Sequence, residues 1–215
     1  MKHNIITLIT IFCLNNLFAV INTHGNSHTI MEKIDTPFES IMMDKINLEA
    51  LFDEDEENIG KGIPMRYAHA FEVDFGIQNS GTWEILNDGS KIWRLGIQSP
   101  NAFGMKVLFD SFWLPEGSEL HVFSKNEEMS IGPYLNEHNN ADGSFGMPLI
   151  KSDHIIIEYY EPLNIKDEPK ININKVFHAY VDIYGFYKND NTRDCGDNVT
   201  CASAYEDQAN SVIFL

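Results

Sequence analysis

Basic residues are scarce in this chain, and their scarcity argues against one large class of partners. The 215 residues include 15 Lys and Arg against 32 Asp and Glu, which gives a formal net charge of −17. A surface that binds duplex nucleic acid needs clustered Lys and Arg to neutralise the phosphates. An anionic membrane surface attracts the same side chains. We therefore expect no nucleic-acid partner and, once any signal peptide is removed, no membrane partner.

Long apolar runs are equally rare, because the only one lies at the N-terminus. An almost unbroken apolar stretch over residues 5–14 follows Lys2 and His3. A charged start, an apolar segment of about ten residues and a small residue at the cleavage site are typical of a secretory signal peptide. The alternative is a membrane anchor, but a spanning helix needs ~20 apolar residues. We predict a signal peptide over residues 1–25, cleaved between 19 and 25, and hence a secreted, extracellular protein.

Cysteine is also scarce, with three residues in the chain. Cys13 lies within the predicted signal peptide, which leaves Cys195 and Cys201 near the C-terminus. In an exported protein these two should be oxidised, either with each other across a tight loop or each with a partner elsewhere. A zinc site is the other interpretation, but two cysteines with no histidine nearby do not supply four ligands. The rest of the exported chain must fold without a disulfide.

Residues 26–64 have the composition of an acidic lead-in or linker. Residues 46–52 follow the pattern of a short amphipathic helix, and an uninterrupted acidic run over 53–57 comes next. A calcium loop would need alternating ligands and a glycine, which this run lacks. We interpret 53–57 as solvated linker, closed by a segment rich in glycine and proline over 60–64.

From Arg66 onward the hydrophobic pattern has a period of two, which is typical of half-buried strands. Asp88 and Gly89 separate two such segments and indicate a hairpin. The predicted strands cover residues 67–78, 82–86, 91–97, 105–109, 119–123, 128–131, 154–160 and 175–184. Many short strands with turn residues between them, and no helical pattern, predict an all-β fold. We expect an antiparallel β-sandwich or jelly-roll-like domain over residues 65–187.

The residues alone show no catalytic constellation. No serine lies in a Gly-x-Ser-x-Gly or Gly-Asp-Ser-Gly arrangement, which would indicate a nucleophile. His69 and His178 fall within predicted strands and are expected to be structural, while His138 and His154 lack the spacing of metal ligands. We therefore predict no catalytic residue, no metal ligand and no cofactor. A catalytic carboxylate pair of the glycosidase type stays an open alternative, because Asp and Glu are plentiful.

The three tryptophans, Trp83, Trp93 and Trp113, could form a platform for a sugar, but they more commonly belong to the core or to cross-strand pairs. An exposed Trp beside polar residues would favour a binding module, and burial of all three would count against it.

Several short motifs follow one another along the chain, at residues 48–51, 62–67, 79–84, 88–95, 114–117, 131–134 and 158–162. In this order and spacing they resemble the pro-region of secreted bacterial trypsin-like serine endopeptidases of the lysyl endopeptidase type. The resemblance covers roughly residues 45–215. It implies a non-catalytic pro-domain that acts as a folding aid or an inhibitor of a trypsin-like serine protease domain.

The C-terminal segment, 188–215, resembles the cleavage region and the start of that family's protease domain. In the family, two such cysteines are tied to partners further along the protease, which this chain does not contain. Cys195 and Cys201 are then expected to pair with each other, to cross-link to another molecule or to stay reactive. The resemblance also implies processing just before Cys195, with Lys188 and Arg193 as the candidate cleavage sites. No catalytic residue can be carried over, because the sequence holds only the first residues of that domain.

Two other functions stay open from the sequence. The chain could be a free-standing extracellular β-sandwich module that binds carbohydrate or a surface protein. A hydrolase in its own right is the least favoured, since it needs a triad or an acid pair that converges in a cleft.

Overall fold

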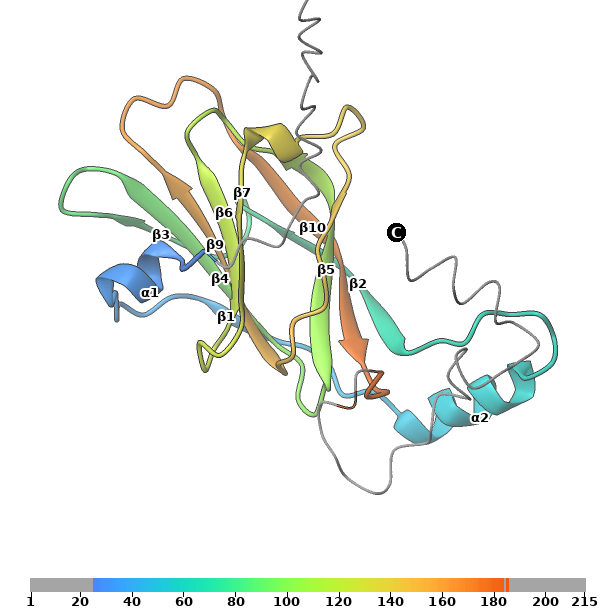
Figure 1. Ribbon diagram of the computed structural model, residues 1–215. Coiled ribbons are helices and arrows are strands. Elements are labelled where there is room, and N and C mark those ends of the chain that lie inside the picture. Colours follow the sequence, from blue (N-terminus) through green and yellow to red (C-terminus); the bar gives the residue numbers. More distant parts are fainter. Residues whose placement is uncertain (1–24, 184, 186–215) are drawn as a thin grey trace, which may run out of the picture.

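The alternating segments of the sequence form strands of two β-sheets in the computed structural model, which describes residues 25–183 and 185 (Figure 1). The elements are α1 (His28–Glu32), β1 (Ser40–Met42), α2 (Leu48–Asn58), β2 (Ala68–Gly76), β3 (Thr82–Ile85), β4 (Lys91–Gln98), β5 (Gly104–Trp113), β6 (Glu119–Ser124), β7 (Ser130–Tyr134), the 3-10 turn η1 (Asn136–His138), β8 (Phe145–Gly146), β9 (His154–Glu161) and β10 (Lys170–Ala179). The prediction of an all-β fold is confirmed.

One sheet has six strands and the other has four. The larger sheet runs in the order β1-β4-β9-β6-β7, and β3 also pairs with β4. The smaller sheet runs β2-β10-β5-β8. The pairs are antiparallel except for the short parallel pair of β1 and β4. None of the helices in the described part of the chain is long and apolar enough to span a membrane.

The two sheets contribute to a single hydrophobic core. Alternate side chains of the strands, which share one face of their sheet, meet there, as the period of two requires. The six-stranded sheet supplies Trp93, Leu95, Ile97, Leu120, Val122, Ile155, Ile157 and Tyr159, and the four-stranded sheet supplies Met105, Val107, Phe109, Ile171, Ile173 and Val176. Nearly all of these side chains are fully buried.

Strand β4 is buried on both faces, because residues 25–43 first cross the outer face of the six-stranded sheet and then add β1 to the sheet beside β4. We call these residues the N-terminal strap. Beneath the strap, Arg94 and Glu158 are opposite each other on β4 and β9, and His121 is opposite Glu158 on β6. The fully buried Glu158 carboxylate accepts the backbone N–H groups of His28 at 2.7 Å and Thr29 at 3.0 Å. The strap is therefore bound by specific polar contacts to a charged row of the sheet.

Gly96 explains how closely the strap approaches the sheet. Strand β1 lies parallel to β4, with Ser40 paired to Gly96. A Cβ atom on Gly96 would lie 2.8 Å from Ser40 Oγ and 3.2 Å from His154 Nε2. Since real Cβ contacts are longer, only glycine permits this close approach of the two strands.

The last strand differs from its prediction. We expected a strand over 175–184, but β10 covers Lys170–Ala179. Its pairing with β2 and β5 shifts register between Ile173 and Lys175. This irregularity interrupts the alternation of buried side chains at Asn174 and hides the first half of the strand from a search for a strict period of two.

The acidic run also differs from its interpretation as linker. Helix α2 continues through residues 53–57, with Asn47 as the N-terminal cap, whose side chain accepts the backbone N–H of Ala50. The helix lies beyond the end of the sheets where β2 begins and β10 ends (Figure 1).

Candidate functional site

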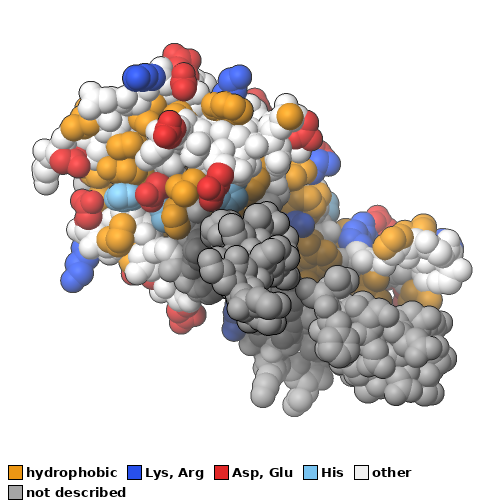
Figure 2. All heavy atoms as spheres, turned by 45° about the horizontal axis from the view of Figure 1, so that its top comes forward, with side chains coloured by type: hydrophobic (Ala, Val, Ile, Leu, Met, Phe, Trp, Pro, Cys, Tyr) orange, Lys and Arg blue, Asp and Glu red, His pale blue; other side chains and the backbone are white. Residues whose placement is uncertain are grey.

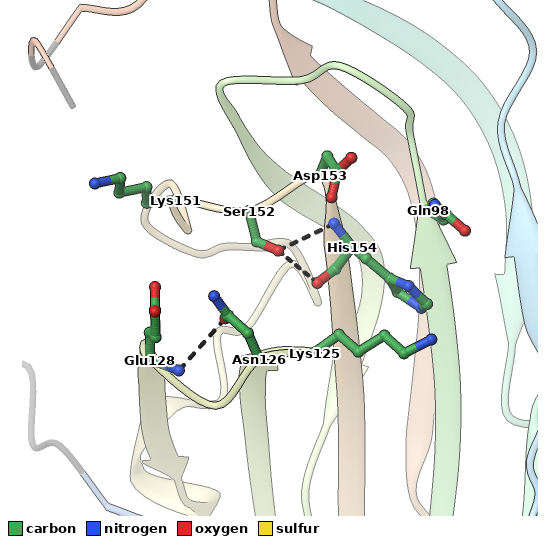
Figure 3. A pocket seen from close by; sticks show the side chains of 8 residues that line it. All are labelled: Gln98, Lys125, Asn126, Glu128, Lys151, Ser152, Asp153 and His154. Carbon is green, nitrogen blue, oxygen red and sulfur yellow. Dashed lines mark hydrogen bonds between the residues drawn. The ribbon is translucent and has the colours of Figure 1, made fainter. Parts of the chain in front are cut away.

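A polar pocket of about 560 Å³ opens at one end of the six-stranded sheet (Figure 3). The turn after β6, the segment before β9 and the end of β4 form it. Its lining comprises Gln98, Lys125, Asn126, Glu128, Lys151, Ser152, Asp153 and His154. Two ammonium and two carboxylate groups face the same space, so the pocket has no strong preference for an ion of either sign.

His154 is the one histidine in the lining of this pocket. Burial lowers the pKa of its imidazole, and Lys125 lowers it further, so the ring is neutral near pH 7. Its Nε2 lies 3.2 Å from Ser40 Oγ. Ser152 fixes the backbone at this position, because its hydroxyl donates to the His154 carbonyl at 2.7 Å and accepts the His154 N–H at 3.0 Å (Figure 3).

The Ser40–His154 pair does not amount to a nucleophilic triad. A triad needs a third group that orients the base through its other ring nitrogen. Among the contacts of residues 25–183, no carboxylate accepts a hydrogen bond from His154 Nδ1. The arrangement fastens β1 to β9, which is a structural role.

A second serine–histidine pair is closed to substrates. Ser99 Oγ lies 2.7 Å from His178 Nδ1, and both side chains are buried. Burial lowers the pKa of the His178 imidazole to about 4, and the neighbouring His69 contributes in the same direction. His178 is thus a neutral, hydrogen-bonded residue between the sheets, as the sequence predicts. His69 lies opposite it on β2 and packs edge-on against Phe71.

The other sequence candidates for ligand binding are dispersed. Within the described residues, no three His, Cys, Asp or Glu side chains are grouped as a metal site requires. His138 lies in η1, where its Nδ1 accepts the backbone N–H of Leu135 at 3.0 Å.

The three tryptophans do not form a common platform. Trp93 is fully buried, whereas Trp83 and Trp113 are 41% and 45% exposed. Trp83 pairs with Trp93 on β3 and β4 and packs edge-on against Tyr159, so it extends a row of core side chains to the edge of the larger sheet. Trp113 ends β5 in the other sheet, opposite Lys170.

The α2 arm, which we define as residues 48–66, is the other candidate site. Three contacts attach the arm to the end of β10. The Tyr180 hydroxyl donates to Asp55 Oδ2 at 2.6 Å, and Arg66 Nε lies 3.0 Å from both Asp55 Oδ1 and the Tyr180 oxygen. The Tyr180 ring also packs edge-on against Phe52. Burial and the hydrogen bond to Asp55 raise the pKa of Tyr180 to about 12, so its hydroxyl keeps the proton that it donates.

A groove of about 550 Å³ lies along this arm. Its lining comprises Phe52, Asp55, Glu56, Asn58, Ile59, Gly60, Ile63, Pro64, Met65, Arg66 and Val181. Ile59, Ile63 and Met65 are 76%, 54% and 69% exposed. The arm projects to one side of the molecule, with hydrophobic side chains on its surface (Figure 2). We call this feature the arm groove.

The arm groove is not among the sites that the sequence predicts, although the sequence holds a signal for it. The hydrophobic residues Ile59, Ile63 and Met65 lie among glycines and a proline, where no strand or helix would bury them. A segment of that kind between an acidic helix and a strand presents apolar side chains to solvent. The contact between Asp55 and Tyr180, in contrast, joins residues 125 positions apart and leaves no local pattern.

The site residues named from the sequence lie elsewhere. Cys195, Cys201, Lys188 and Arg193 are outside the described residues, as are residues 1–24 of the predicted signal peptide and the whole segment 188–215 that resembles the cleavage region and the start of a protease domain. Their predicted disulfide and processing roles stay predictions.

No model of a known protein family matches the sequence, and no solved structure matches the chain.

Proposed function

We propose that this chain is a secreted, non-catalytic β-sandwich pro-domain of a trypsin-like serine endopeptidase, and that it acts as a folding aid or inhibitor of the protease. The ordered set of motifs over residues 45–215 suggests the family. The structure adds an observation that is independent of that resemblance: the chain leaves the sheets at the arm groove.

The place where the chain leaves the sheets is the main support for this proposal. Strand β10 ends at Ala179, Tyr180 anchors the arm, and Val181 lines the groove. Just after β10, the chain therefore runs along an exposed apolar surface at Val181. A pro-domain must contact its protease domain, and apolar surface with a polar rim is what such contacts use.

The charge of the chain supports the same function. A net charge of −17 favours a basic partner surface. Helix α2 adds five consecutive acidic residues, 53–57, to the arm itself. Attraction of this kind accelerates encounter and selects among partners more than it adds affinity.

Inhibition in trans tests the proposal. The full chain is added to an active lysine-specific trypsin-like endopeptidase, and hydrolysis of a chromogenic lysyl substrate is followed. The refolding yield of the denatured protease is measured in the same series. We expect inhibition that saturates with the chain, a higher refolding yield, or both. If neither rate nor yield changes, the pro-domain function is wrong.

A second function is favoured by one observation. Trp113 is 45% exposed at the end of a strand, beside Lys170, which is how a carbohydrate-binding module would present an aromatic ring. A glycan array with the full chain and with Trp113→Ala tests it. Binding that depends on Trp113 would favour an independent binding module, and binding that survives the substitution would not.

A further inference from the structure

We propose that the arm groove binds residues 212–215 of the same chain, the apolar sequence Val-Ile-Phe-Leu. The inference rests on the proposed function in one respect: the inference and the function both assume that the arm contacts the part of the chain that follows the two sheets. It goes further by naming the bound segment, and it concerns residues that this chain contains.

The groove needs a partner because it exposes side chains that water solvates poorly. Ile59, Ile63 and Met65 are each more than half exposed, and Phe52 lies at the base of the arm. The charged groups Arg66 and Asp55 of the lining are paired, since Arg66 binds Glu54 and Asp55, and Asp55 binds Tyr180. Apart from Glu56 and Asn58, the rest of the lining is apolar, so the groove fits a mainly apolar segment.

The chain can reach the groove from its own C-terminal side. Val181 already lines the groove. The 31 peptide units between Val181 and residue 212 span up to about 100 Å when extended, so length does not restrict the contact. A segment tethered in this way has an effective concentration on the order of millimolar, and a weak apolar contact is then enough for binding.

The sequence beyond residue 182 offers one segment of the right character. Val212–Leu215 is its longest uninterrupted apolar run. The connecting sequence 186–211 carries Lys188 and Arg193 against five acidic residues, so its net charge does not attract it to the acidic residues 53–57 of α2. The inference therefore rests on the apolar contact in the groove and on the tether.

Hydrogen–deuterium exchange on the full chain tests the inference. The groove variant is Ile63→Ser combined with Met65→Ser, and the segment variant is Ile213→Ser combined with Phe214→Ser. All four substitutions keep the charge. The control is Ile85→Ser, a 72% exposed residue of β3 that does not line the groove. Unfolding by urea verifies that each variant is folded.

We expect slowed exchange of amides 212–215 in the wild type and the control. The groove variant should accelerate that exchange about tenfold or more, since two apolar contacts are lost. The segment variant should accelerate exchange in the groove loop 59–66 in return. Protection is also expected to be independent of protein concentration.

Three results would overturn the inference. The first is unprotected exchange at 212–215 in the wild type, and the second is protection that the groove variant leaves unchanged. The third is protection that grows with protein concentration and accompanies a dimer in size-exclusion chromatography, because the groove would then bind a second copy. Since none of these results involves protease inhibition, failure here is distinguishable from failure of the proposed function.

Discussion

Single residues with altered titration explain how this protein should respond to acid. His178 is buried, hydrogen-bonded to Ser99 and neutral, with its pKa lowered to about 4. An unfolded histidine has a pKa near ~6.5. Between these two values the unfolded chain binds a proton that the folded chain does not, so acid favours unfolding in that range.

We therefore predict that the free energy of unfolding falls as the pH decreases from about 6.5 to about 4, and that His178 contributes up to about 3 kcal/mol of this loss. Urea unfolding at several pH values measures it, in the wild type and in His178→Asn. The variant should show a flatter dependence. His154 acts with the same sign and remains in both proteins. Equal slopes would contradict the assignment.

Two aspartates titrate in a different range. Hydrogen bonds from Ser90 and Ser144 lower the pKa values of Asp88 and Asp142, respectively. Their contribution is present above the unfolded pKa of about 4 and is lost only as the pH falls below it. Acid unfolding above pH 4 is thus assigned to the histidines.

At the scale of elements, the strap depends on one buried carboxylate. Glu158 accepts two backbone N–H groups of α1 and faces Arg94 across the strands. Arg94 is buried as well and binds Glu84 and Thr36 of the surrounding segments. Removal of Glu158 would leave Arg94 with one anionic partner fewer and the strap amides without an acceptor.

We predict that Glu158→Ala lowers the free energy of unfolding by about 3 kcal/mol and accelerates amide exchange over residues 27–31. The matched control is Glu72→Ala, which removes a surface ion pair with Lys175 and should change stability by less than about 0.5 kcal/mol. Unchanged exchange in the strap would show that Glu158 does not attach it.

The arm depends on Tyr180 in a similar way. Tyr180→Phe removes the hydroxyl that donates to Asp55 and lies 3.0 Å from Arg66 Nε. We predict a local loss of about 2 kcal/mol, seen as faster exchange along α2. Tyr67→Phe, just before β2, is the control. Exchange of the core strands should not change, and α2 protection equal to that of the wild type would contradict this role for the hydroxyl.

Elements also show which parts of the fold can be predicted from sequence. Strands β2, β4, β6 and β9 have clear local patterns, and the sequence predicts each of them. Strand β1 has three residues and pairs in parallel with a strand more than 50 residues away, so no local pattern indicates it. The start of β10 is hidden by the irregularity at Asn174. Contacts between distant segments, such as Glu158 with the strap, leave no trace in a single sequence.

The same limit applies to the candidate site. Sequence predicts an acidic segment before the strands, and the structure adds that it is a helix, anchored to the end of β10 and beside a groove. The groove forms only because residues 48–66 and Val181 meet in space. A local pattern cannot contain that information, although the unburied Ile59, Ile63 and Met65 point to it.

At the scale of the whole molecule, the net charge predicts that association with the proposed protease depends on salt. With a net charge of −17, binding to a basic protease surface should be faster at low salt. We predict that the association rate constant falls at least tenfold between about 20 and about 500 mM NaCl, because the Debye length shortens roughly fivefold over this range. Stopped-flow mixing measures it. A salt-independent rate would contradict electrostatic steering.

The pro-domain function is tested most directly by reading the transcript beyond codon 215. The account predicts that the frame continues into a domain with a catalytic histidine, an aspartate and a Gly-Asp-Ser-Gly motif, together with cysteines to pair with Cys195 and Cys201. A stop codon directly after Leu215, with no protease encoded downstream, would contradict it.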